Sequence, residues 1–363
     1  MAGATLGSLA KGRRTFDNPA QYTSFWEETM RLHKIALAGL CALTLSAAAQ
    51  AAEPVKIRMS WVAPIANWAS IIMEKQDLAQ HLGKSYTLET VHYQGTPQSI
   101  TAIANNELEV ASLAYSSLAI AIENAGLDLR VIADEFQDGV PGYFSTEFYV
   151  LKDSPIQKVE DLKGKVVGTN GGGSAVDIAA RAMLKEHGLE DKRDFTMLEG
   201  PLPAMPAMLL EKKADLIPGV LPFALNPKLK SDGRILFHQR DALGVTQMIV
   251  LTARKSFIDK NRAAMVDYME DMLRIVHWYL DPKNHDEAAK IAAKITKQPP
   301  ERFGWLFTKQ DAYRDPDLMP NLEALQKNID ETQKLGFIKK KIDIQKYADL
   351  SLVKEAKARL EKK

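Results

Sequence analysis

Hydrophobic and polar residues follow two different periods along the first part of the chain. A strand-like alternation or a short apolar run occurs at residues 55–62, 87–93, 109–113 and 129–133. A helical spacing of three to four positions between apolar residues occurs at 67–81, 96–104 and 116–125. Because predicted strands and helices follow one another in turn, we expect an α/β fold whose sheet is largely parallel.

The same arrangement repeats after residue 146 and is followed by a helical C-terminal part. Strands are predicted at residues 147–151, 165–168, 196–198, 214–218, 234–238 and 246–252, with helices at 174–187 and 204–212. The remaining predicted helices are separated by prolines and cover residues 256–281, 284–296, 301–308, 320–335 and 350–361.

This order of elements predicts two lobes that are joined by extended crossings. We assign residues 52–146 to a first lobe, residues 147–245 to a second lobe, and residues 246–363 to a return into the first lobe with a tail of C-terminal helices. Two such crossings would form a hinge around a cleft between the lobes. Ligands of such sheets bind at the carboxyl ends of the strands, where we therefore look for site residues.

Residues 30–51 have the three parts of a secretory signal peptide. A positively charged start is followed by an apolar run and by an Ala-Gln-Ala cleavage site that ends at residue 51. The run is too short to span a membrane, so we expect export to the periplasm. We interpret residues 1–29, upstream of this segment, as an over-extended or non-native start, with a disordered tail as the alternative.

The composition is that of a globular protein with an ordinary core. The chain has 363 residues, of which 46% are hydrophobic and 26% charged, enough for two packed lobes. Residues 1–51 contain five Lys or Arg and three Asp or Glu, so their removal changes the net charge from +1 to −1. No basic stripe interleaved with aromatic residues is present, and we expect no nucleic-acid partner.

The single cysteine, Cys41, lies inside the apolar run of the signal peptide. A lipid anchor on this thiol is disfavoured because Leu40 before it is too large for lipoprotein processing. The exported chain then has no cysteine, so it can form no disulfide and must be held by its core.

The most informative motif is a glycine-rich turn at residues 171–173, between a predicted strand and a predicted helix. The backbone N–H groups of such a turn and the helix dipole attract a carboxylate, sulfonate or phosphate, and glycines allow close approach. One interpretation is an anion cradle formed by Gly172, Gly173, Ser174 and Ala175. The alternative is a plain helix entry capped by Ser174. A nucleotide site is disfavoured, because the third glycine of the dinucleotide fingerprint and a P-loop lysine are missing.

Two turns of the first lobe also end strands and open helices. Their candidate residues are Thr96, Pro97 and Gln98 after the second strand, and Tyr115, Ser116 and Ser117 after the third. Hydroxyl and amide groups at these positions would contact the other side of a ligand in the cleft. Helix capping alone, with proline at the first helical position, is the alternative interpretation.

Further candidate residues are aromatic or polar and follow other strands. Trp61 ends the first strand, and Asn67 and Trp68 follow within the next turns. Tryptophan walls would stack on a flat or apolar ligand, whereas packing at the edge of the lobe is the alternative. In the second lobe, Phe223 follows a strand and His238 ends one, so both are expected to face the cleft.

The sequence has no recognisable catalytic or metal-binding constellation. Its histidines form no H-E-x-x-H motif, and no cysteine of the exported chain can join them in a metal site. A G-x-S-x-G nucleophile elbow is interrupted by Val176. Asp134 and Glu135 are predicted to be solvated charges on a loop. We therefore expect no cofactor and no enzymatic activity.

Three stretches carry a resemblance to a known family, namely residues 95–117 (GTPQSITAIANNELEVASLAYSS), 159–189 (VEDLKGKVVGTNGGGSAVDIAARAMLKEHGL) and 207–224 (AMLLEKKADLIPGVLPFA). Together with the order of the elements, they make residues 55–280 resemble a type II periplasmic solute-binding protein of an ABC importer. More narrowly, the chain is similar to the nitrate-, sulfonate- and taurine-binding group and its thiamine-precursor-binding relatives. The D-L-K-G-K block is shared by many subfamilies, so it indicates the fold more than the ligand.

This resemblance implies binding without turnover, and it implies an inner-membrane permease and a cytoplasmic ATPase as partners. The family's ligand positions fall on residues 61–67, 96–98, 115–117 and 173–175. No Arg or Lys lies at these turns. We therefore expect amides and hydroxyls to bind a small organic anion, an aromatic or aliphatic carboxylate or sulfonate rather than nitrate. We expect the protein to be a monomer.

Two other functions are open on the sequence alone. Thiamine-pyrimidine-synthase-like enzymes share the fold family but work inside the cell, which the signal peptide argues against. A binding protein that docks on a sensor receptor would show the same sequence features as a transport component. Neighbouring genes for a permease and an ATPase would distinguish these two cases.

Overall fold

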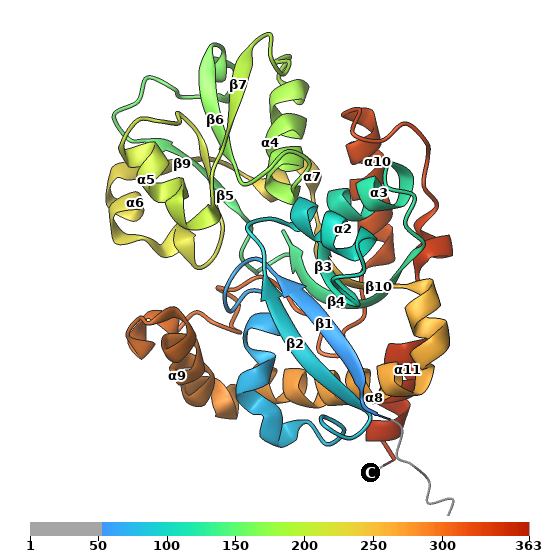
Figure 1. Cartoon of the computed structure of the whole chain (residues 1–363). Coiled ribbons are helices and arrows are strands. Elements are labelled where there is room, and N and C mark those ends of the chain that lie inside the picture. The colour runs from blue at the N-terminus through green and yellow to red at the C-terminus, as the bar shows by residue number, and fades with distance from the viewer. Residues whose placement is uncertain (1–52, 363) are drawn as a thin grey trace, which may run out of the picture. The chain divides into compact units, whose positions relative to one another are not determined.

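The computed structural model describes residues 53–362 of the chain (Figure 1). The predicted signal peptide at residues 30–51, Cys41 and the start at residues 1–29 lie outside the described residues. The described residues form a mixed α/β structure that confirms the predicted fold class.

A five-stranded sheet forms the centre of the first lobe, in the order β2-β1-β3-β10-β4. Its strands are β1 (Val55–Trp61), β2 (Tyr86–His92), β3 (Val110–Ala114), β4 (Leu129–Asp138) and β10 (Thr246–Arg254). Strand β1 pairs in parallel with β2 and β3, whereas β10 is antiparallel to β3 and β4. The expectation of a largely parallel sheet is thus wrong for β10, because this strand enters from the second lobe in the opposite direction.

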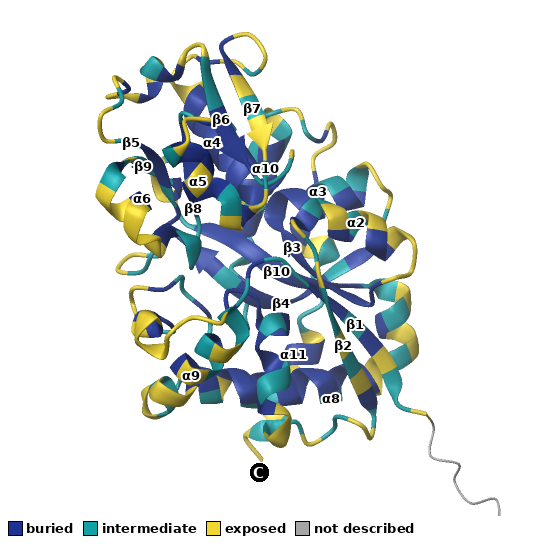
Figure 2. Ribbon diagram, turned by 60° about the vertical axis from the view of Figure 1, so that its left-hand side comes forward, coloured by how far each residue is buried: buried dark blue, intermediate teal, exposed yellow. Residues whose placement is uncertain are grey.

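Helices cover both faces of this sheet (Figure 1). One face carries α2 (Thr96–Ala104), α3 (Tyr115–Glu123) and α10 (Leu322–Lys334), and the other carries α8 (Lys255–Leu280) and α11 (Ser351–Leu360). Helix α9 (His285–Thr296) follows α8 and packs against it and against the turn at residues 300–303. Figure 2 shows that buried residues follow the central strands and most of α8, while exposed residues are common on α9. The long C-terminal helices were predicted to within a few residues.

Two segments that were predicted as helices form tighter 3-10 turns instead. The first, residues 67–81, consists of η1 (Trp68–Ser70) and η2 (Ile72–Leu78), with a break in helical geometry at Lys75. The second, residues 301–308, is reduced to η7 (Pro300–Phe303), which begins next to Pro299. A 3-10 helix also places every third residue on one side. Apolar residues three positions apart therefore fit these short turns as well as an α-helix.

The second lobe contains a three-stranded and a two-stranded sheet. Antiparallel pairing joins β8 (Ile217–Gly219), β5 (Glu147–Leu151) and β9 (Gly233–His238), and β6 (Lys165–Thr169) is parallel to β7 (Phe195–Glu199). Around them lie α4 (Ala175–Glu186), α5 (Met205–Leu210), α6 (Pro227–Asp232) and α7 (Gln239–Leu243). The remaining 3-10 turns are η3 (Val159–Leu162), η4 (Leu202–Ala204), η5 (Phe223–Leu225), η6 (Pro282–Asn284) and η8 (Ile344–Tyr347).

One hydrophobic core cluster continues from the first lobe into the second. It includes Leu113 and Leu118 of the first lobe together with Ile178 and Phe237 of the second. The described residues therefore pack as one compact unit. The predicted crossings fall between β4 and β5 and between α7 and β10, while the lobe boundaries themselves stay a prediction.

Candidate functional site

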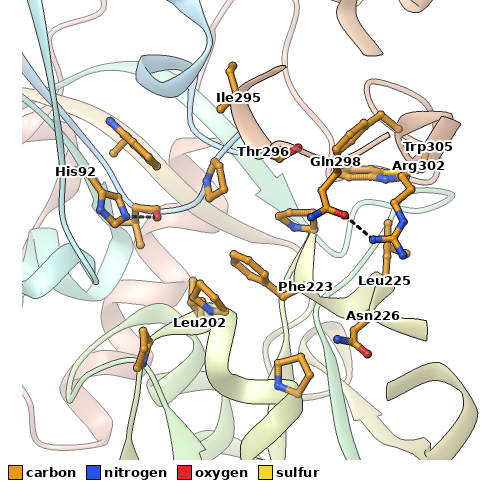
Figure 3. A pocket seen from close by; sticks show the side chains of 18 of the residues that line it. His92, Leu202, Phe223, Leu225, Asn226, Ile295, Thr296, Gln298, Arg302 and Trp305 are labelled. Atoms are coloured by element: carbon orange, nitrogen blue, oxygen red, sulfur yellow. Dashed lines mark hydrogen bonds between the residues drawn. The ribbon is translucent and has the colours of Figure 1, made fainter. Parts of the chain in front are cut away.

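A cavity of about 680 Å³ lies where the first lobe, the second lobe and a C-terminal segment meet (Figure 3). The first lobe supplies Trp61, Val62, Pro64, His92 and Gln94. The second lobe supplies Pro201, Leu202, Pro203, Pro206, Pro222, Phe223, Leu225, Asn226 and Pro227. The C-terminal segment supplies Ile295, Thr296, Gln298, Arg302, Phe303 and Trp305. Most of these side chains are apolar, and five of them are prolines from the second lobe.

The first-lobe wall is built on the carboxyl ends of two parallel strands. Trp61 ends β1 and His92 ends β2, and the two residues are direct partners in the strand register. Their rings are 4.2 Å apart between centroids and tilted by 42°. The Nε2 atom of His92 lies 3.2 Å from the carbonyl oxygen of Val62, which ties the ring to the loop after β1. Trp61, which the sequence analysis proposed as an aromatic wall of the ligand site, lines this cavity.

The loop after β1 is fixed by Asn67 from the inside. The Oδ1 atom of this buried side chain accepts hydrogen bonds from the backbone N–H groups of Val62 at 2.9 Å and Ala63 at 2.8 Å. Asn67 therefore positions the backbone that borders the cavity, while its own side chain is not part of the lining.

Trp68 lies in the core beneath the same loop. Its side chain is 1% exposed and stacks on Phe307, with 5.7 Å between ring centroids and an interplanar angle of 8°. Its backbone N–H donates to the carboxylate of Glu135 at 2.8 Å. The structure thus separates the two tryptophans that the sequence grouped together: Trp61 borders the cavity and Trp68 is buried in the core of the first lobe.

In the second lobe, Phe223 and His238 occupy different environments. Phe223 begins η5 and points into the cavity, between the side of His92 and the side of Arg302 (Figure 3). His238 is outside the lining and forms the start of α7, where its backbone N–H donates to Asp241 Oδ2 at 2.7 Å. The cavity therefore includes Phe223 and leaves out His238.

The C-terminal segment contributes residues that the sequence analysis missed. Arg302 is the only Lys, Arg, Asp or Glu among the lining residues of the described chain. Its Nη1 atom donates to Gln298 Oε1 at 2.6 Å, and no carboxylate pairs with it within residues 53–362. No local motif marks this arginine, because it reaches the cavity only through the long-range packing of α9 and η7 against the first lobe.

The glycine turn lies outside the cavity, and its amide groups already have acceptors. The N–H of Gly172 donates to Glu199 Oε1 at 2.8 Å, and the N–H of Gly173 donates to Asp177 Oδ2 at 2.8 Å. Ser174 caps α4 by accepting from the N–H of Asp177 at 3.3 Å. In this structure, carboxylates of the chain occupy the positions that an anionic ligand would take in the predicted cradle.

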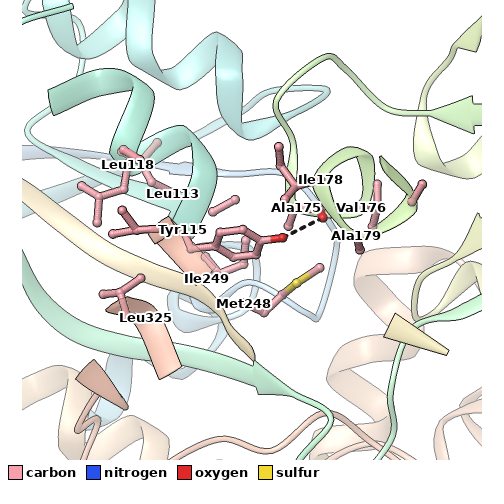
Figure 4. Close-up of a cluster of buried hydrophobic side chains, with 14 of the residues drawn as sticks. Leu113, Tyr115, Leu118, Ala175, Val176, Ile178, Ala179, Met248, Ile249 and Leu325 are labelled. Atoms are coloured by element: carbon pink, nitrogen blue, oxygen red, sulfur yellow. Dashed lines mark hydrogen bonds between the residues drawn. The ribbon is translucent and has the colours of Figure 1, made fainter. Parts of the chain in front are cut away.

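The candidate hydroxyl groups of the first lobe lie against this turn. The Tyr115 hydroxyl donates to the carbonyl oxygen of Ala175 at 3.1 Å, and Ser116 Oγ donates to that of Gly173 at 2.7 Å. Around Tyr115, apolar side chains of both lobes meet directly (Figure 4). These residues were expected to line the cleft, whereas here their hydroxyl groups join one lobe to the other.

The remaining candidates, Thr96, Pro97, Gln98 and Ser117, stand next to this contact. Thr96 Oγ1 and Ser117 Oγ are hydrogen-bonded at 2.8 Å and both are buried. The exposed Gln98 accepts from the backbone N–H of Gln94 at 2.9 Å. Pro97 lies beside the turn, 3.9 Å from the position that a Cβ on Gly171 would take.

Asp134 and Glu135 were predicted as solvated charges on a loop, and this prediction is wrong. Both lie on β4 with no exposed surface, and burial raises the pKa of each to about 7. Near them, Arg314 donates to the backbone carbonyl of Ala66 at 3.2 Å and lies 5.4 Å over the ring of Trp68. This buried charged group supports the loop after β1 from below.

Two negative findings apply to the described part of the chain. None of its helices has the length and apolar character that a membrane crossing requires. Residues 53–362 also contain no group of three or more His, Asp or Glu placed to hold a metal ion.

Comparison with known proteins gives a family and several structural neighbours. The model of the NMT1-like family matches residues 50–293. A search of curated proteins found no match. The alkanesulfonate-binding protein SsuA from Xanthomonas axonopodis pv. citri, bound to MOPS, is 18% identical with a TM-score of 0.65, covering 82% of this chain and 99% of that chain.

Two other solved structures have a similar fold. The periplasmic nitrate-binding protein NrtA from Synechocystis PCC 6803 is 15% identical with a TM-score of 0.66, covering 85% of this chain and 90% of that chain. A DszB variant in complex with biphenyl-2-sulfinic acid is 14% identical with a TM-score of 0.59. The match covers 84% of this chain and 99% of that chain. At these identities the similarity shows the fold, which confirms the predicted two-lobe periplasmic binding protein architecture.

Proposed function

Because the chain belongs to the NMT1-like family, we propose that it is the extracytoplasmic substrate-binding component of an ABC importer. It captures a small organic anion between its lobes in the periplasm and delivers it to an inner-membrane permease that works with a cytoplasmic ATPase. The observation that carries this proposal is the cavity of about 680 Å³, whose walls come from both lobes and from the segment 295–305.

The size and walls of the cavity favour an organic ligand over an inorganic ion. Cavities that hold small organic molecules typically measure about 300–1,000 Å³, and they combine apolar walls with a few polar groups. Nitrate would fill only a small part of this space. An aromatic or aliphatic carboxylate or sulfonate fits both the apolar lining and the single cation, Arg302. The alkanesulfonate-binding and nitrate-binding neighbours support an anion as the class of ligand.

Closure of the two lobes would couple binding to recognition by the permease. The hydrogen bonds from Tyr115 to Ala175 and from Ser116 to Gly173 join the lobes directly at one end of their contact. A ligand that touches both lobes elsewhere stabilises the closed form in proportion to its greater affinity for that form. The cavity offers such contacts through Trp61 on one lobe and Phe223 on the other.

The proposal is tested by measuring the melting temperature of the purified protein against a panel of anions. The panel contains nitrate, bicarbonate, taurine, alkanesulfonates, aryl carboxylates and aryl sulfonates. A ligand at a hundredfold excess over its Kd adds about 2.7 kcal/mol of stability, which is a shift on the order of 5 °C for a protein of this size.

A matched variant shows whether such a shift comes from the cavity. Leu225 lines the cavity and is 38% exposed, so Leu225→Glu places a carboxylate there with little effect on the core. We expect this variant to melt near the wild-type temperature without ligand and to lose the anion-induced shift. A wild-type protein that responds to no compound of the panel contradicts the proposed function.

A further inference from the structure

We infer that Arg302 binds the acidic group of the ligand and that the apolar body of the ligand lies against Trp61 and Phe223. The preferred ligand is then an aromatic acid with one negative charge. This inference rests on the proposed function and adds to it the residue that holds the anion and the direction in which the ligand lies. It also moves the anion site from the glycine turn to the C-terminal segment.

The guanidinium of Arg302 has unused donors. A guanidinium carries five N–H donors, and within residues 53–362 only one side-chain bond is made, from Nη1 to Gln298 Oε1 at 2.6 Å. No Asp or Glu of the described chain forms an ion pair with Arg302 or lines the cavity. A carboxylate or sulfonate can accept two parallel hydrogen bonds from such a group, which is the strongest geometry for an anion.

The backbone of Arg302 is held in place by the residues on either side. Its N–H donates to the carbonyl oxygen of Pro299 at 3.1 Å within the turn η7. Phe303 is 3% exposed and Trp305 is 8% exposed, and both pack into the core cluster beneath the first-lobe sheet. The exposed side chain of Arg302 therefore extends from a turn whose backbone is fixed.

The opposite part of the cavity suits a flat apolar group. The ring of Trp61 is fixed by its contact with His92, at 4.2 Å between centroids. Phe223 projects from the second lobe into the middle of the cavity, with His92 on one side and Arg302 on the other (Figure 3). Aromatic side chains favour stacked or edge-to-face contacts with another ring. A ring that lies beside Phe223 can point its acidic group toward Arg302.

The glycine turn does not offer an equivalent anion site in this structure. Two of its amides donate to Glu199 and Asp177, and these carboxylates would have to leave before an external anion could bind. Arg302 is the cation that a ligand in the cavity can reach without displacing an acidic side chain.

The test is isothermal titration calorimetry of the purified protein with 4-biphenylcarboxylate, with its neutral amide and with sodium nitrate. We expect the acid to bind the wild-type protein and Arg302→Gln to weaken it by about 10- to 100-fold, the range for one lost charge-assisted contact. The amide should bind less tightly and should respond little to the same substitution. Trp61→Ala should weaken the acid and the amide alike.

Lys309→Gln is the matched control. Lys309 is exposed, lies seven residues after Arg302 and is outside the cavity lining, so its substitution makes the same change in net charge. We expect its affinity for 4-biphenylcarboxylate to stay within about twofold of wild type. Equal losses in Arg302→Gln and Lys309→Gln would overturn the assignment of Arg302, as would an amide that binds as tightly as the acid.

The outcomes separate this inference from the proposed function. If the wild-type protein binds nitrate or an aliphatic acid but neither biphenyl compound, the aromatic-acid inference is wrong while the binding-protein function stands. If it binds none of the anions in the thermal panel or the calorimeter, both are wrong. Melting temperatures of all variants without ligand, measured alongside, show that each is folded.

Discussion

The carboxylate of Asp177 accepts a hydrogen bond from the backbone N–H of Gly173, with 2.8 Å between Oδ2 and the nitrogen. Asp177 is fully buried, and Arg181 Nε lies 3.0 Å from each of its carboxylate oxygens. Burial raises the pKa of Asp177, while Arg181 and the Gly173 amide act in the opposite direction. The glycine turn thus binds an anion that belongs to the chain, together with its own counterion.

We predict that Asp177→Asn lowers the free energy of unfolding by about 3–5 kcal/mol, because it leaves the buried part of Arg181 without its main partner. Urea unfolding measures the change. Asp191→Asn is the control, since Asp191 also pairs with Arg181, at 2.6 Å, but is 33% exposed. Asp191→Asn should lower the free energy of unfolding by less than about 1 kcal/mol. Similar losses in the two variants would show that the turn does not depend on Asp177.

The close approach of the two lobes at the turn gives a second prediction. Gly173 has a φ of +78°, and a Cβ there would lie 2.7 Å from Ile120 Cδ1 of α3 in the first lobe. Gly83 has nearly the same φ, +77°, but a Cβ at this position would meet no other atom within 4 Å. Gly83→Ala should therefore lower the free energy of unfolding only by the backbone strain at this position, about 1 kcal/mol.

We expect Gly173→Ala to lower the free energy of unfolding by up to about 1 kcal/mol more than Gly83→Ala does, because the added Cβ meets the terminal methyl of Ile120, which must move aside. The difference between the two losses, measured by urea unfolding, reports the packing of the turn against α3. A larger radius of gyration in Gly173→Ala by X-ray scattering would show that the lobes separate to relieve the contact. Equal losses in both variants would show that the contact between residue 173 and Ile120 does not contribute to stability.

The order of elements could be predicted from the sequence because it depends on local patterns. Periods of two and of three to four residues gave nearly all strands and the long helices α8 and α10 at close to their observed bounds. The strand-turn-helix around the glycine turn was also predicted. The acceptors of the turn's amide groups could not be predicted from the sequence. Glu199 reaches Gly172 only through the register of β6 and β7, in which Thr169 pairs with Glu199.

The candidate site was predictable only where its residues end strands. Trp61 ends β1, Phe223 follows β8, and both border the cavity. Arg302 was missed, because it follows a helix and a pair of prolines and reaches the cavity by packing between segments distant in sequence. Glu135 was assigned to a loop because an acidic pair usually indicates solvent, whereas β4 continues through it to Asp138.

The buried carboxyl group of Glu135 gives a pH-dependent prediction. Burial raises its pKa to about 7, whereas an unfolded glutamate has its usual pKa near 4.5. Between these values the folded state binds more protons than the unfolded state, so this group makes the protein less stable as the pH rises from about 5 to 7. The limiting slope for one such group is about 1.4 kcal/mol per pH unit.

Glu135→Gln removes this titration while keeping an oxygen that can accept from the N–H of Trp68. The free energy of unfolding of the variant minus that of the wild type should therefore increase as the pH is raised from 5 to 8, because only the wild type loses this contribution to its stability. Urea unfolding at four pH values in that interval measures the difference. A difference that is constant across the interval would show that Glu135 does not titrate there.

The hydroxyl of Tyr115 provides a test of closure that leaves side-chain volume almost unchanged. It donates to the carbonyl oxygen of Ala175 at 3.1 Å and so links the two lobes. Tyr115→Phe should lower the free energy of unfolding by about 1 kcal/mol, the net contribution of one hydrogen bond. Because the lost bond exists only when the lobes are together, the closed form should become less populated. A ligand that requires the closed form would then bind up to about fivefold more weakly.

Tyr268→Phe is the control for this prediction, since the Tyr268 hydroxyl donates to Met59 Sδ at 3.1 Å inside the first lobe. It also removes one buried hydroxyl, but no contact between the lobes. We expect it to lower the free energy of unfolding without changing the affinity for the anion that gives the largest thermal shift. Tyr115→Phe should change both quantities and enlarge the ligand-free protein in X-ray scattering. If the two variants instead lose affinity equally, the bond from Tyr115 to Ala175 does not control closure, and binding would depend on the cavity alone.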